Sequence, residues 1–368
     1  MSARATTLAQ AFSNRVLGEM YDRSLVDDIV NRDYQGEVNG VGSKLNMLNF
    51  GRLSEKDYSG TALSADDLTE FNAVLTIEKQ KAFYFKEKTI DNYKSYIKDP
   101  HSKIIAQIAM ERNRNMDIYV LGFYGDVAAG NRVGTNYTTG TVTVDVTTGV
   151  VTGSGTTFTA AMVGRGFKAT GHTKWYRVKT YSSGTSIVIE DDKDDITSAY
   201  TGGAISGGTA YIIEAATPVA ITTTNLLQKI ADLKQKLDEV QQYGANAVPL
   251  EGRFLVVPPA FLNTYFRATG VALHVPAVYE GLIQKGLAGE LLGFKVYVSN
   301  DLTGNNTDGW RVLAGHTNWM TFAEKILQNR IEEDIIGDFG VAYKDLMVYG
   351  AKIPDARRSQ AAELYCTF

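Results

Sequence analysis

The chain has 368 residues, and its 37 basic and 41 acidic side chains give a formal net charge of −4. This balance argues against a dedicated nucleic-acid-binding protein, because such proteins are typically basic. The single cysteine, Cys366, excludes a disulfide framework. The sequence has no run of 18 apolar residues, so no membrane-spanning helix is predicted. The first residues lack the apolar core of a secretory signal. The length is typical of two or three domains.

The first third of the chain predicts an extended hairpin followed by a long helix. Leu75–Ile77 and Ala82–Phe85 flank a polar Glu78–Lys81 turn, which is typical of a hairpin or an extended loop. From His101 to Tyr124, apolar residues recur at spacings of three, four or seven, so they form one stripe on a helix. At 1.5 Å per residue this helix is roughly 36 Å long.

A β-rich segment follows the helix. Residues 134–187 contain fifteen threonines, a residue type that favours pleated strands, together with glycines that favour turns. Val142, Val144 and Val146 recur at a period of two and therefore predict one buried strand face. We expect residues 130–216 to form an all-β module, either a small sandwich or a barrel.

The last part of the chain has a mixed pattern. An apolar stripe predicts a helix over Asn225–Tyr243, with Asp232 and Lys236 as a supporting ion pair. Arg253–Val257 predicts a strand that ends at Pro258 and Pro259, because proline cannot donate a ladder hydrogen bond. Further strands are predicted at Phe294–Val298, Trp310–Ala314, Lys344–Lys352 and Ser359–Cys366. The fold class is therefore α+β with an all-β insertion.

No motif for catalysis is present in the sequence. The phosphate-binding, dinucleotide-binding and nucleophile-elbow patterns are all incomplete or missing, and the four histidines are isolated. We therefore predict neither an enzyme nor a bound cofactor. The only metal candidates are Asp191, Asp192, Asp194 and Asp195, but Lys193 interrupts them and a solvated acidic turn is the more common arrangement.

Two aromatic segments are candidate interaction sites. Lys79 and Lys81 precede the aromatic run Phe83, Tyr84 and Phe85, which fits either an arm that contacts a neighbouring subunit or a strand whose rings fill the core. Trp175, Tyr176 and Arg177 fit either a surface for a glycan or a partner, or part of a β core. Arg357 and Arg358, in the turn between the last two strands, are further candidates for a subunit interface.

The order of these elements resembles that of tailed-phage major capsid proteins. In the first part of the chain, the resemblance is carried by Arg15–Glu37 for the N-terminal arm, Leu75–Tyr93 for the extended loop and His101–Tyr124 for the spine helix. The axial domain would begin with Asn225–Gly244 and Arg253–Phe261 and continue with Gly289–Asn300 and Val312–Gly315. The closing peripheral strands would be Val348–Lys352 and Ala361–Tyr365. Gly153–Phe167 and Trp175–Val178 resemble a small β module of other phage virion proteins.

The resemblance implies the Hong Kong 97-type capsid fold, with five parts. These are an N-terminal arm (1–60), an extended loop and peripheral domain (61–129), the inserted β module (130–216), an axial domain (217–343) and return strands of the peripheral domain (344–368). It also implies a structural protein that assembles into hexamers and pentamers of an icosahedral head enclosing double-stranded DNA, held non-specifically. Scaffold, portal and decoration proteins are the implied partners, without a membrane. The implied location is the virion, after assembly in the host cytoplasm.

Two other functions fit the same residues. An encapsulin-like compartment shell would use the same fold around a cargo protein, although those shells are usually shorter and lack the β insertion. A virion protein whose β module binds a glycan or receptor through Trp175, Tyr176 and Arg177 is the second alternative.

Overall fold

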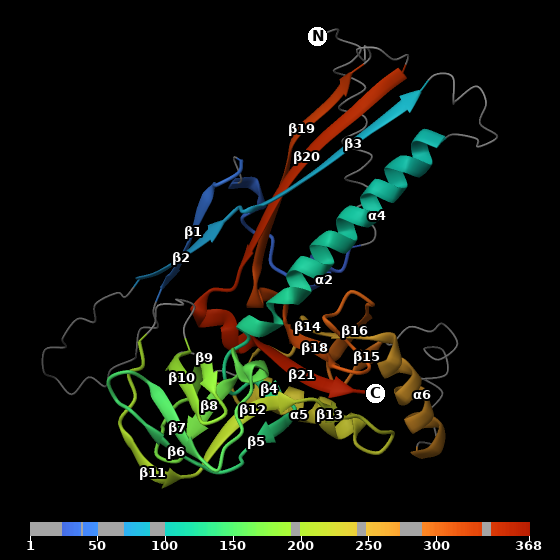
Figure 1. Cartoon of the computed structure of the whole chain (residues 1–368). Helices are drawn as coiled ribbons and strands as arrows, with labels where there is room; N and C mark the ends of the chain where they lie inside the picture. Colours follow the sequence, from blue (N-terminus) through green and yellow to red (C-terminus); the bar gives the residue numbers. More distant parts are fainter. Residues whose placement is uncertain are drawn as a thin grey trace, which may run out of the picture. The chain divides into compact units, whose positions relative to one another are not determined.

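The chain folds into two compact units in the computed structural model (Figure 1). The first unit comprises Met1–Val120 and Met320–Lys352, and the second comprises Leu121–Trp319 and Ile353–Phe368. The structure describes residues 24–37, 40–50, 70–88, 100–192, 199–240, 248–272, 289–332 and 340–368. The N-terminal part of the predicted arm, residues 1–23, lies outside these ranges.

A long helix and a three-stranded antiparallel sheet dominate the first unit (Figure 1). The sheet has the order β19 (Thr321–Glu332), β20 (Gly340–Lys352) and β3 (Lys79–Lys88). The helix α4 (Pro100–Leu121) has 22 residues and is therefore about 33 Å long. Its buried side chains include Ile105, Ala109 and Met116, which confirms the predicted apolar stripe.

A second, two-stranded sheet in the first unit pairs β1 (Lys44–Phe50) with β2 (Glu70–Thr76). Two short helical segments precede it, α2 (Val26–Ile29) and η1 (Gln35–Glu37). This sheet packs on β19 and β20 through a small core, whose buried members are Leu45, Met47, Leu75, Ile77, Ala323 and Val348.

The predicted hairpin between Leu75–Ile77 and Ala82–Phe85 is wrong. β2 pairs with β1, whereas β3 pairs with β20, so the chain passes from one sheet into another without reversing. The crossing is close, because a Cβ atom on Gly350 would lie 2.6 Å from the carbonyl oxygen of Thr76. The missing side chain of Gly350 therefore lets the two strands cross.

In its described residues, the second unit contains a mixed sheet and two helices. The order of strands in the sheet is β13 (Val219–Ala220), β21 (Ala361–Thr367), β18 (Gly309–His316), β14 (Arg253–Val257), β16 (Phe294–Val298) and β15 (Glu290–Leu291). Two short strands pair in addition: β17 (Gly304–Asn305) with β18, and β4 (Arg132–Val133) with β21. The helices are α5 (Leu226–Asp238) and α6 (Pro259–Ala272). Leu226, Ile230, Leu233 and Leu237 of α5 are buried in the core.

All five residues of β14 are buried, as expected for the centre of a sheet covered on both faces. Pro258 ends this strand and Pro259 is the first residue of α6, a position where proline is favoured because its missing N–H needs no partner. On α5, the predicted Asp232–Lys236 pair is wrong, because Asp232 is bonded to Lys229 at 2.7 Å.

The β-rich segment of the second unit forms an eight-stranded antiparallel sheet with its own apolar core. Its order is β11 (Ile205–Thr209), β6 (Thr141–Val144), β7 (Val150–Ser154), β10 (Ser186–Asp191), β9 (Tyr176–Ser183), β8 (Gly166–Ala169), β12 (Tyr211–Thr217) and β5 (Thr135–Tyr137). Val142 and Val144 are buried as predicted, but Val146 is exposed. It lies beyond the end of β6, in a turn where the Asp145 carboxylate accepts the N–H groups of Thr147 and Thr148.

The end of the chain is divided between the units. The sequence predicts that residues 344–368 return to one domain, whereas β20 lies in the first unit and β21 in the second. β21 pairs antiparallel with β18 and parallel with β4 and β13, so its position is fixed by three strands of the second unit. Short 3₁₀ segments complete the elements: η2 (Gly122–Asp126), η3 (Ala160–Met162), η4 (Thr317–Trp319) and η5 (Asp355–Gln360). Among the described residues, no helix is long and apolar enough to span a membrane.

Candidate functional site

A buried cluster of charges connects the two sheets of the second unit. The carboxylate of Glu363, on β21, is fully buried and accepts Arg165 Nη1 at 2.8 and 3.0 Å. Arg311 Nη1 of β18 lies 2.9 Å from the same carboxylate, and Arg132 Nε of β4 lies 3.3 Å from it. Because Arg165 belongs to the β-rich segment and Glu363 to the mixed sheet, this carboxylate holds the two sheets together.

Glu214 is the second carboxylate of the cluster. It accepts the N–H of Gly130 at 2.8 Å and lies 3.3 Å from Arg132 Nη1. Burial raises its pKa above the ordinary value, and the Arg132 charge opposes this rise. Gly166 leaves the space that the carboxylate occupies, since a Cβ atom there would collide with it.

Arg358 extends the cluster instead of facing solvent. Its Nη2 lies 2.8 Å from the Asp192 carboxylate, and its Nε donates to the carbonyl oxygen of Asp126 at 2.8 Å. The side chain is 4% exposed and has a structural role within the chain, and the subunit-interface role of Arg358 stays a prediction. The neighbouring Arg357 is half-buried and lies 3.4 Å from the carbonyl oxygen of Asn318.

The acidic run does not gather around one point. Asp191 accepts Lys174 at 2.8 Å and the hydroxyl of Thr201 at 2.7 Å, whereas Asp192 binds Arg358. Asp194 and Asp195 lie outside the described residues. Across the part of the chain that the structure describes, no group of three or more acidic, histidine or cysteine side chains could hold a metal ion.

The predicted aromatic platform is not formed as a shared exposed surface. Tyr176 is 3% exposed and lies in the core of the β-rich sheet. Trp175 packs on Gly130, where a Cβ atom would lie 2.7 Å from its ring, and Lys168 lies 5.8 Å from the ring centre. Arg177 points away from Tyr176 because alternate strand residues face opposite sides, and it lies 4.0 Å from Asp126.

The aromatic segment of β3 lies on the first unit, as an edge strand of the three-stranded sheet. Phe85 stacks on Tyr343 at 4.8 Å, and Phe83 lies 5.2 Å below the guanidinium of Arg112. Tyr84 points to the other face and is 61% exposed. Phe83 and Phe85 therefore pack inward, as in the core alternative, and contact of this segment with a neighbouring subunit stays a prediction.

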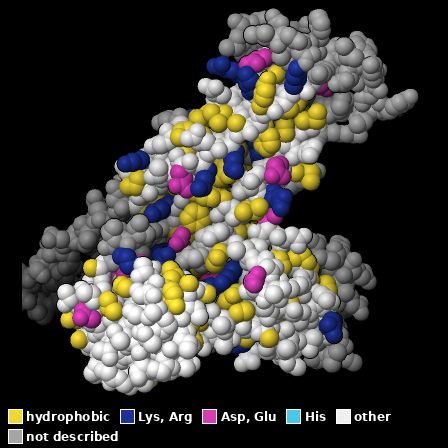
Figure 2. All heavy atoms as spheres, viewed as in Figure 1, with side chains coloured by type: hydrophobic (Ala, Val, Ile, Leu, Met, Phe, Trp, Pro, Cys, Tyr) yellow, Lys and Arg dark blue, Asp and Glu magenta, His cyan; other side chains and the backbone are white. Residues whose placement is uncertain are grey.

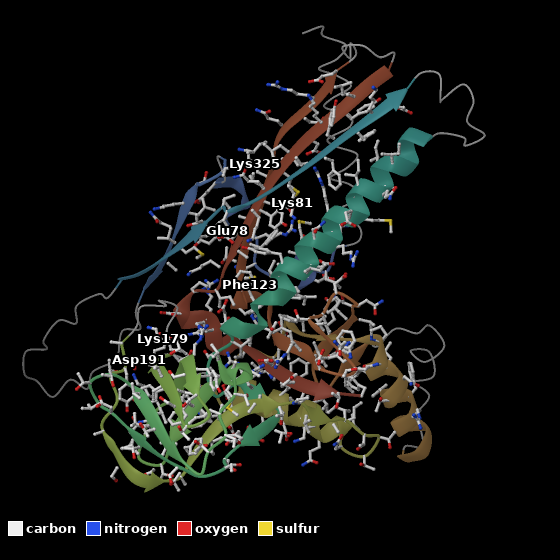
Figure 3. All side chains as sticks on the ribbon, viewed as in Figure 1. Glu78, Lys81, Phe123, Lys179, Asp191 and Lys325 are labelled. Carbon is white, nitrogen blue, oxygen red and sulfur yellow. The ribbon has the colours of Figure 1, made fainter. Side chains whose placement is uncertain are left out.

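The two lysines of this strand have different surroundings. Lys79 pairs with Glu78 at 3.3 Å and lies 5.4 Å from the Tyr119 ring centre. Lys81 is exposed on the side of β3 that faces α4 (Figure 3). Because they lie within a paired strand, neither lysine is at the tip of a hairpin.

The sequence analysis missed a buried ion pair between the long helix and the sheet. Arg112 of α4 and Asp345 of β20 are both almost completely buried, and their charged atoms lie 2.5 Å apart. A signal was present, because position 112 continues the apolar stripe of Ala109 and Met116 with a charged residue. Glu363 has a similar signal, since it interrupts an apolar strand. Charges at core positions require partners, and their identity depends on the tertiary fold.

Exposed apolar side chains are a further feature of the first unit. Met110 and Ile118 on α4 are 54% and 44% exposed, in addition to Tyr84. Figure 2 shows lysine and arginine side chains among apolar patches on the visible face of this unit. Apolar side chains mixed with charges are typical of surfaces that a protein partner covers.

The remaining reactive side chains are held in structural positions. His172 accepts the N–H of Ala169, and its other ring nitrogen lies 2.7 Å from the Tyr200 hydroxyl, which donates to the carbonyl oxygen of Gly203. Cys366 is buried in the mixed sheet, and burial raises the pKa of its thiol to about 12, so it remains protonated at neutral pH. These surroundings favour packing over proton transfer.

Comparison with known proteins finds similarity to phage capsid proteins. Residues 184–359 match a family model described as phage capsid protein, whereas no curated protein sequence matches. Among solved structures, the chain is similar to one from Mycobacterium phage Che8, with 16% identity and a TM-score of 0.53, covering 93% of this chain and 90% of that one. It is also similar to the capsid of cyanophage P-SCSP1u, with 13% identity, a TM-score of 0.55 and coverage of 94% and 88%.

The mature capsid of bacteriophage PhiM1 shows the same fold, with 10% identity, a TM-score of 0.51 and coverage of 94% and 87%. These similarities extend over almost the whole of both chains, and the long helix with its sheet and the mixed sheet of the second unit fit the Hong Kong 97-type architecture. The comparisons thus show a phage capsid protein match over residues 184–359 and a fold shared with solved phage structures over almost the whole chain.

Proposed function

We propose that this protein builds the closed icosahedral shell of a phage head from hexamers and pentamers of a single chain. The observation that carries the proposal is the surface of the first unit. A helix of about 33 Å and strands of up to 13 residues expose large apolar side chains next to charges. Such a surface suits contacts between subunits, which need area and complementarity more than a pocket for chemistry.

The enclosed cargo is proposed to be double-stranded DNA, held without sequence recognition. A net charge of −4 disfavours tight binding of every subunit to DNA, because phosphate binding depends on clustered basic side chains. Weak contacts on the inner face would let the genome enter and leave. The proposed setting is the virion, after assembly in the host cytoplasm with scaffold, portal and decoration proteins as partners. We expect no catalytic activity.

We propose that the eight-stranded sheet is an inserted module displayed on the outside of the shell. Its separate apolar core supports an insertion, and the buried carboxylate of Glu363 supports a rigid attachment. Because the native Cys366 is buried, a single introduced thiol can report exposure. Thr180→Cys on β9 should react with a maleimide too large to cross intact shells, whereas reaction only after the shells are opened would place the module inside.

An encapsulin-like compartment remains the alternative function for the same fold. Shells purified from the native host should contain nuclease-protected DNA if the chain is a phage capsid protein. Cargo protein in place of DNA would favour the compartment. A glycan array with intact shells tests the second alternative, for which Trp175→Ala is the matched variant, because Trp175 retains partial exposure.

The assembly itself can be tested on the purified chain, alone and with its scaffold, by sedimentation velocity. We expect species that sediment as pentamers, hexamers and closed particles as the concentration is raised. A chain that stays monomeric at all concentrations, with and without scaffold, would contradict the proposed function.

A further inference from the structure

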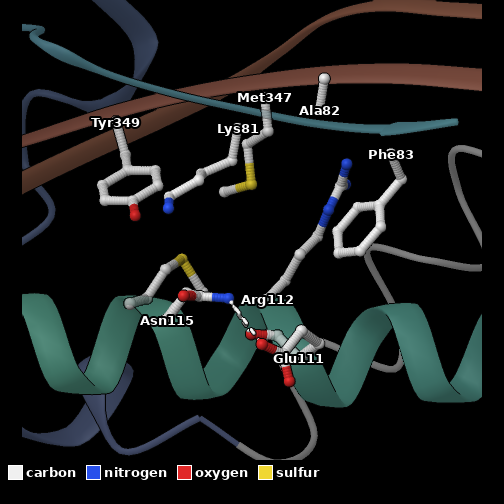
Figure 4. A pocket seen from close by; sticks show the side chains of 9 residues that line it. Lys81, Ala82, Phe83, Glu111, Arg112, Asn115, Met347 and Tyr349 are labelled. Atoms are coloured by element: carbon white, nitrogen blue, oxygen red, sulfur yellow. Dashed lines mark hydrogen bonds between the residues drawn. The ribbon is translucent and has the colours of Figure 1, made fainter.

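The three-stranded sheet of the first unit has two different faces. Alternate residues of β3 and β20 point toward α4 and line a pocket of about 260 Å³ against that helix (Figure 4). The charges at this pocket balance, because Lys81 and Arg112 are matched by Glu111 and by Asp345, the partner of Arg112. The intervening residues point away from α4, and the charges of the described residues on that side do not balance.

The strand register places three rows of side chains on this second face. Residues that pair directly across antiparallel strands point to the same side, and so do residues two positions apart along a strand. The rows, read from β3 through β20 to β19, are Lys86, Ala342 and Glu332, then Tyr84, Lys344 and Arg330, then Ala82, Leu346 and Gln328. We call these nine residues the basic sheet face. It is roughly 10 Å wide, because three neighbouring strands span two interstrand distances.

The charged side chains of the basic sheet face are open to solvent. Tyr84 is 61% exposed, and the side chain of Lys344 is 45% exposed. Lys86 and Arg330 are exposed as well. Three of the nine residues are cationic and only Glu332 is acidic, so the face is net positive although the whole chain has a charge of −4. An anion in solution can therefore reach these cations without displacing other described residues.

The polar side chains of this face are mainly hydrogen-bond donors. Lysine and arginine only donate, and the Tyr84 hydroxyl and the exposed Gln328 amide can donate as well. The one carboxylate, that of Glu332, already accepts Lys344 Nζ at 2.7 Å. Arg330 forms no hydrogen bond or ion pair with a described residue. The face therefore suits a partner whose surface offers acceptors.

The backbone of double-stranded DNA is such a partner. Lysine, arginine, tyrosine and glutamine are among the residues that contact phosphate oxygens in protein–DNA complexes. DNA carries about one negative charge per 1.7 Å of its axis, so several phosphates lie within the width of the face. A second protein chain would present donors as well as acceptors, and lysine is depleted at protein–protein interfaces. The residue types of this face thus favour a phosphate backbone over a protein.

We propose that the basic sheet face contacts the phosphate backbone of the packaged double-stranded DNA. The inference rests on the proposed function, in which the shell encloses DNA, and it places this face on the inside of the shell. Lys86, Arg330 and Lys344 neutralise phosphates, and Tyr84 donates a hydrogen bond to them. Lys344 exchanges Glu332 for a phosphate, because an exposed ion pair is weak. The contact is independent of base sequence, since the phosphates are the same at every base pair.

Binding of a fluorescein-labelled DNA duplex to the full-length, unassembled chain tests the proposal, by fluorescence anisotropy at increasing salt. Lys86→Gln with Lys344→Gln should weaken binding at least tenfold at low salt and lower the slope of log K against log salt by about 1.8, because two phosphate contacts are lost. The matched control, Lys79→Gln with Lys81→Gln, removes the same charge from the opposite face of β3 and should change binding less than twofold. Equal affinities of the two double variants would overturn the proposal.

Glu332→Gln tests the same face with a change of opposite sign. It removes the one acidic side chain of the basic sheet face and releases Lys344, so DNA should bind about threefold more tightly at low salt. A gain in affinity cannot result from unfolding. Unchanged or weaker binding by this variant would overturn the proposal.

Lysine footprinting tests the contact inside the shell. Shells filled with DNA and shells emptied of it are treated with a small acetylating reagent, and acetylation is measured by mass spectrometry. Lys86 and Lys344 should react several-fold less in filled shells and recover in emptied ones. Equal reaction in both would overturn the proposal. Protection that persists in emptied shells would overturn it too, because a neighbouring protein would then cover the face.

These experiments separate the basic sheet face from the assembly. If the chain forms no shells, or if its shells contain no DNA, the proposed function fails. If shells form and hold DNA while Lys86 and Lys344 react equally in filled and emptied shells, only the proposal for the basic sheet face fails.

Discussion

Buried charged residues have different surroundings in the two units. In the second unit, three arginines surround the buried Glu363, and a fourth, Arg358, pairs with Asp192. In the first unit, the buried Arg112 pairs with a single carboxylate, that of Asp345. The second unit thus surrounds a buried carboxylate with several cations, whereas the first pairs one buried cation with one carboxylate.

The strongest test of this contrast is Glu363→Gln. Removing one partner of a buried ion pair typically costs about 3–5 kcal/mol, and here three guanidinium groups lose their common carboxylate charge. We expect a loss of about 5 kcal/mol in the free energy of unfolding, measured by urea denaturation. Glu290→Gln, an exposed change on β15 of the same unit, serves as the control and should have little effect. Equal stability of the two variants would contradict the clamping role of Glu363.

Arg112→Leu should have the next largest effect, since it leaves one buried carboxylate, Asp345, without its cation. The expected loss in the free energy of unfolding is about 3 kcal/mol. The double variant Arg112→Leu with Asp345→Leu should recover part of this loss, because no charge is then buried alone. Strictly additive losses in this double-mutant cycle would show that the two side chains do not interact.

A smaller, pH-dependent effect is expected from His172 in the β-rich sheet. Burial lowers the pKa of His172 below its ordinary value, with a further contribution from Lys168. Its contribution to stability is therefore complete above about pH 6.5, the ordinary pKa of histidine, and is lost as the pH falls toward and through the lower folded value.

Melting temperatures at pH 7.5 and 5.5 measure this contribution. Wild type should lose more stability on acidification than His172→Gln. His316, whose pKa burial also lowers, contributes in the same direction, so His172→Gln should reduce the pH dependence without abolishing it. An identical pH dependence in wild type and variant would contradict a buried, neutral His172.

The smallest effect should come from the exposed ion pair of the first unit. Lys344 lies 2.7 Å from Glu332, but both side chains are more than 40% exposed. We expect Lys344→Gln to change the free energy of unfolding by less than about 0.5 kcal/mol, because solvent screens such pairs. A loss as large as that of Arg112→Leu would show that the sheet surface is less open to solvent than the structure indicates.

Local patterns predicted most elements of the fold. The apolar stripe located α4, the buried run before Pro258 located β14, and the threonine-rich segment located the eight-stranded sheet. These features depend on residues close in sequence, whose spacing reports which face is buried. Strand pairing, in contrast, depends on residues that can lie far apart in the sequence. β2 and β3 are adjacent in sequence but pair with β1 and β20, and no local signal distinguishes this from a hairpin.

The candidate sites were less predictable, because they depend on distant partners. Arg358 looked like an exposed residue of a turn, but Asp192, far away in sequence, buries its charge. Tyr176 looked like part of a platform until strand alternation placed it in the core. Arg112 meets its partner Asp345 only where α4 packs on β20, so this pair requires the tertiary structure.

Electron microscopy of the purified protein tests the central claim, assembly of this chain with copies of itself, most directly. We predict hollow polyhedral particles of uniform size. A field of dispersed single molecules under every assembly condition, with the scaffold present, would contradict the claim.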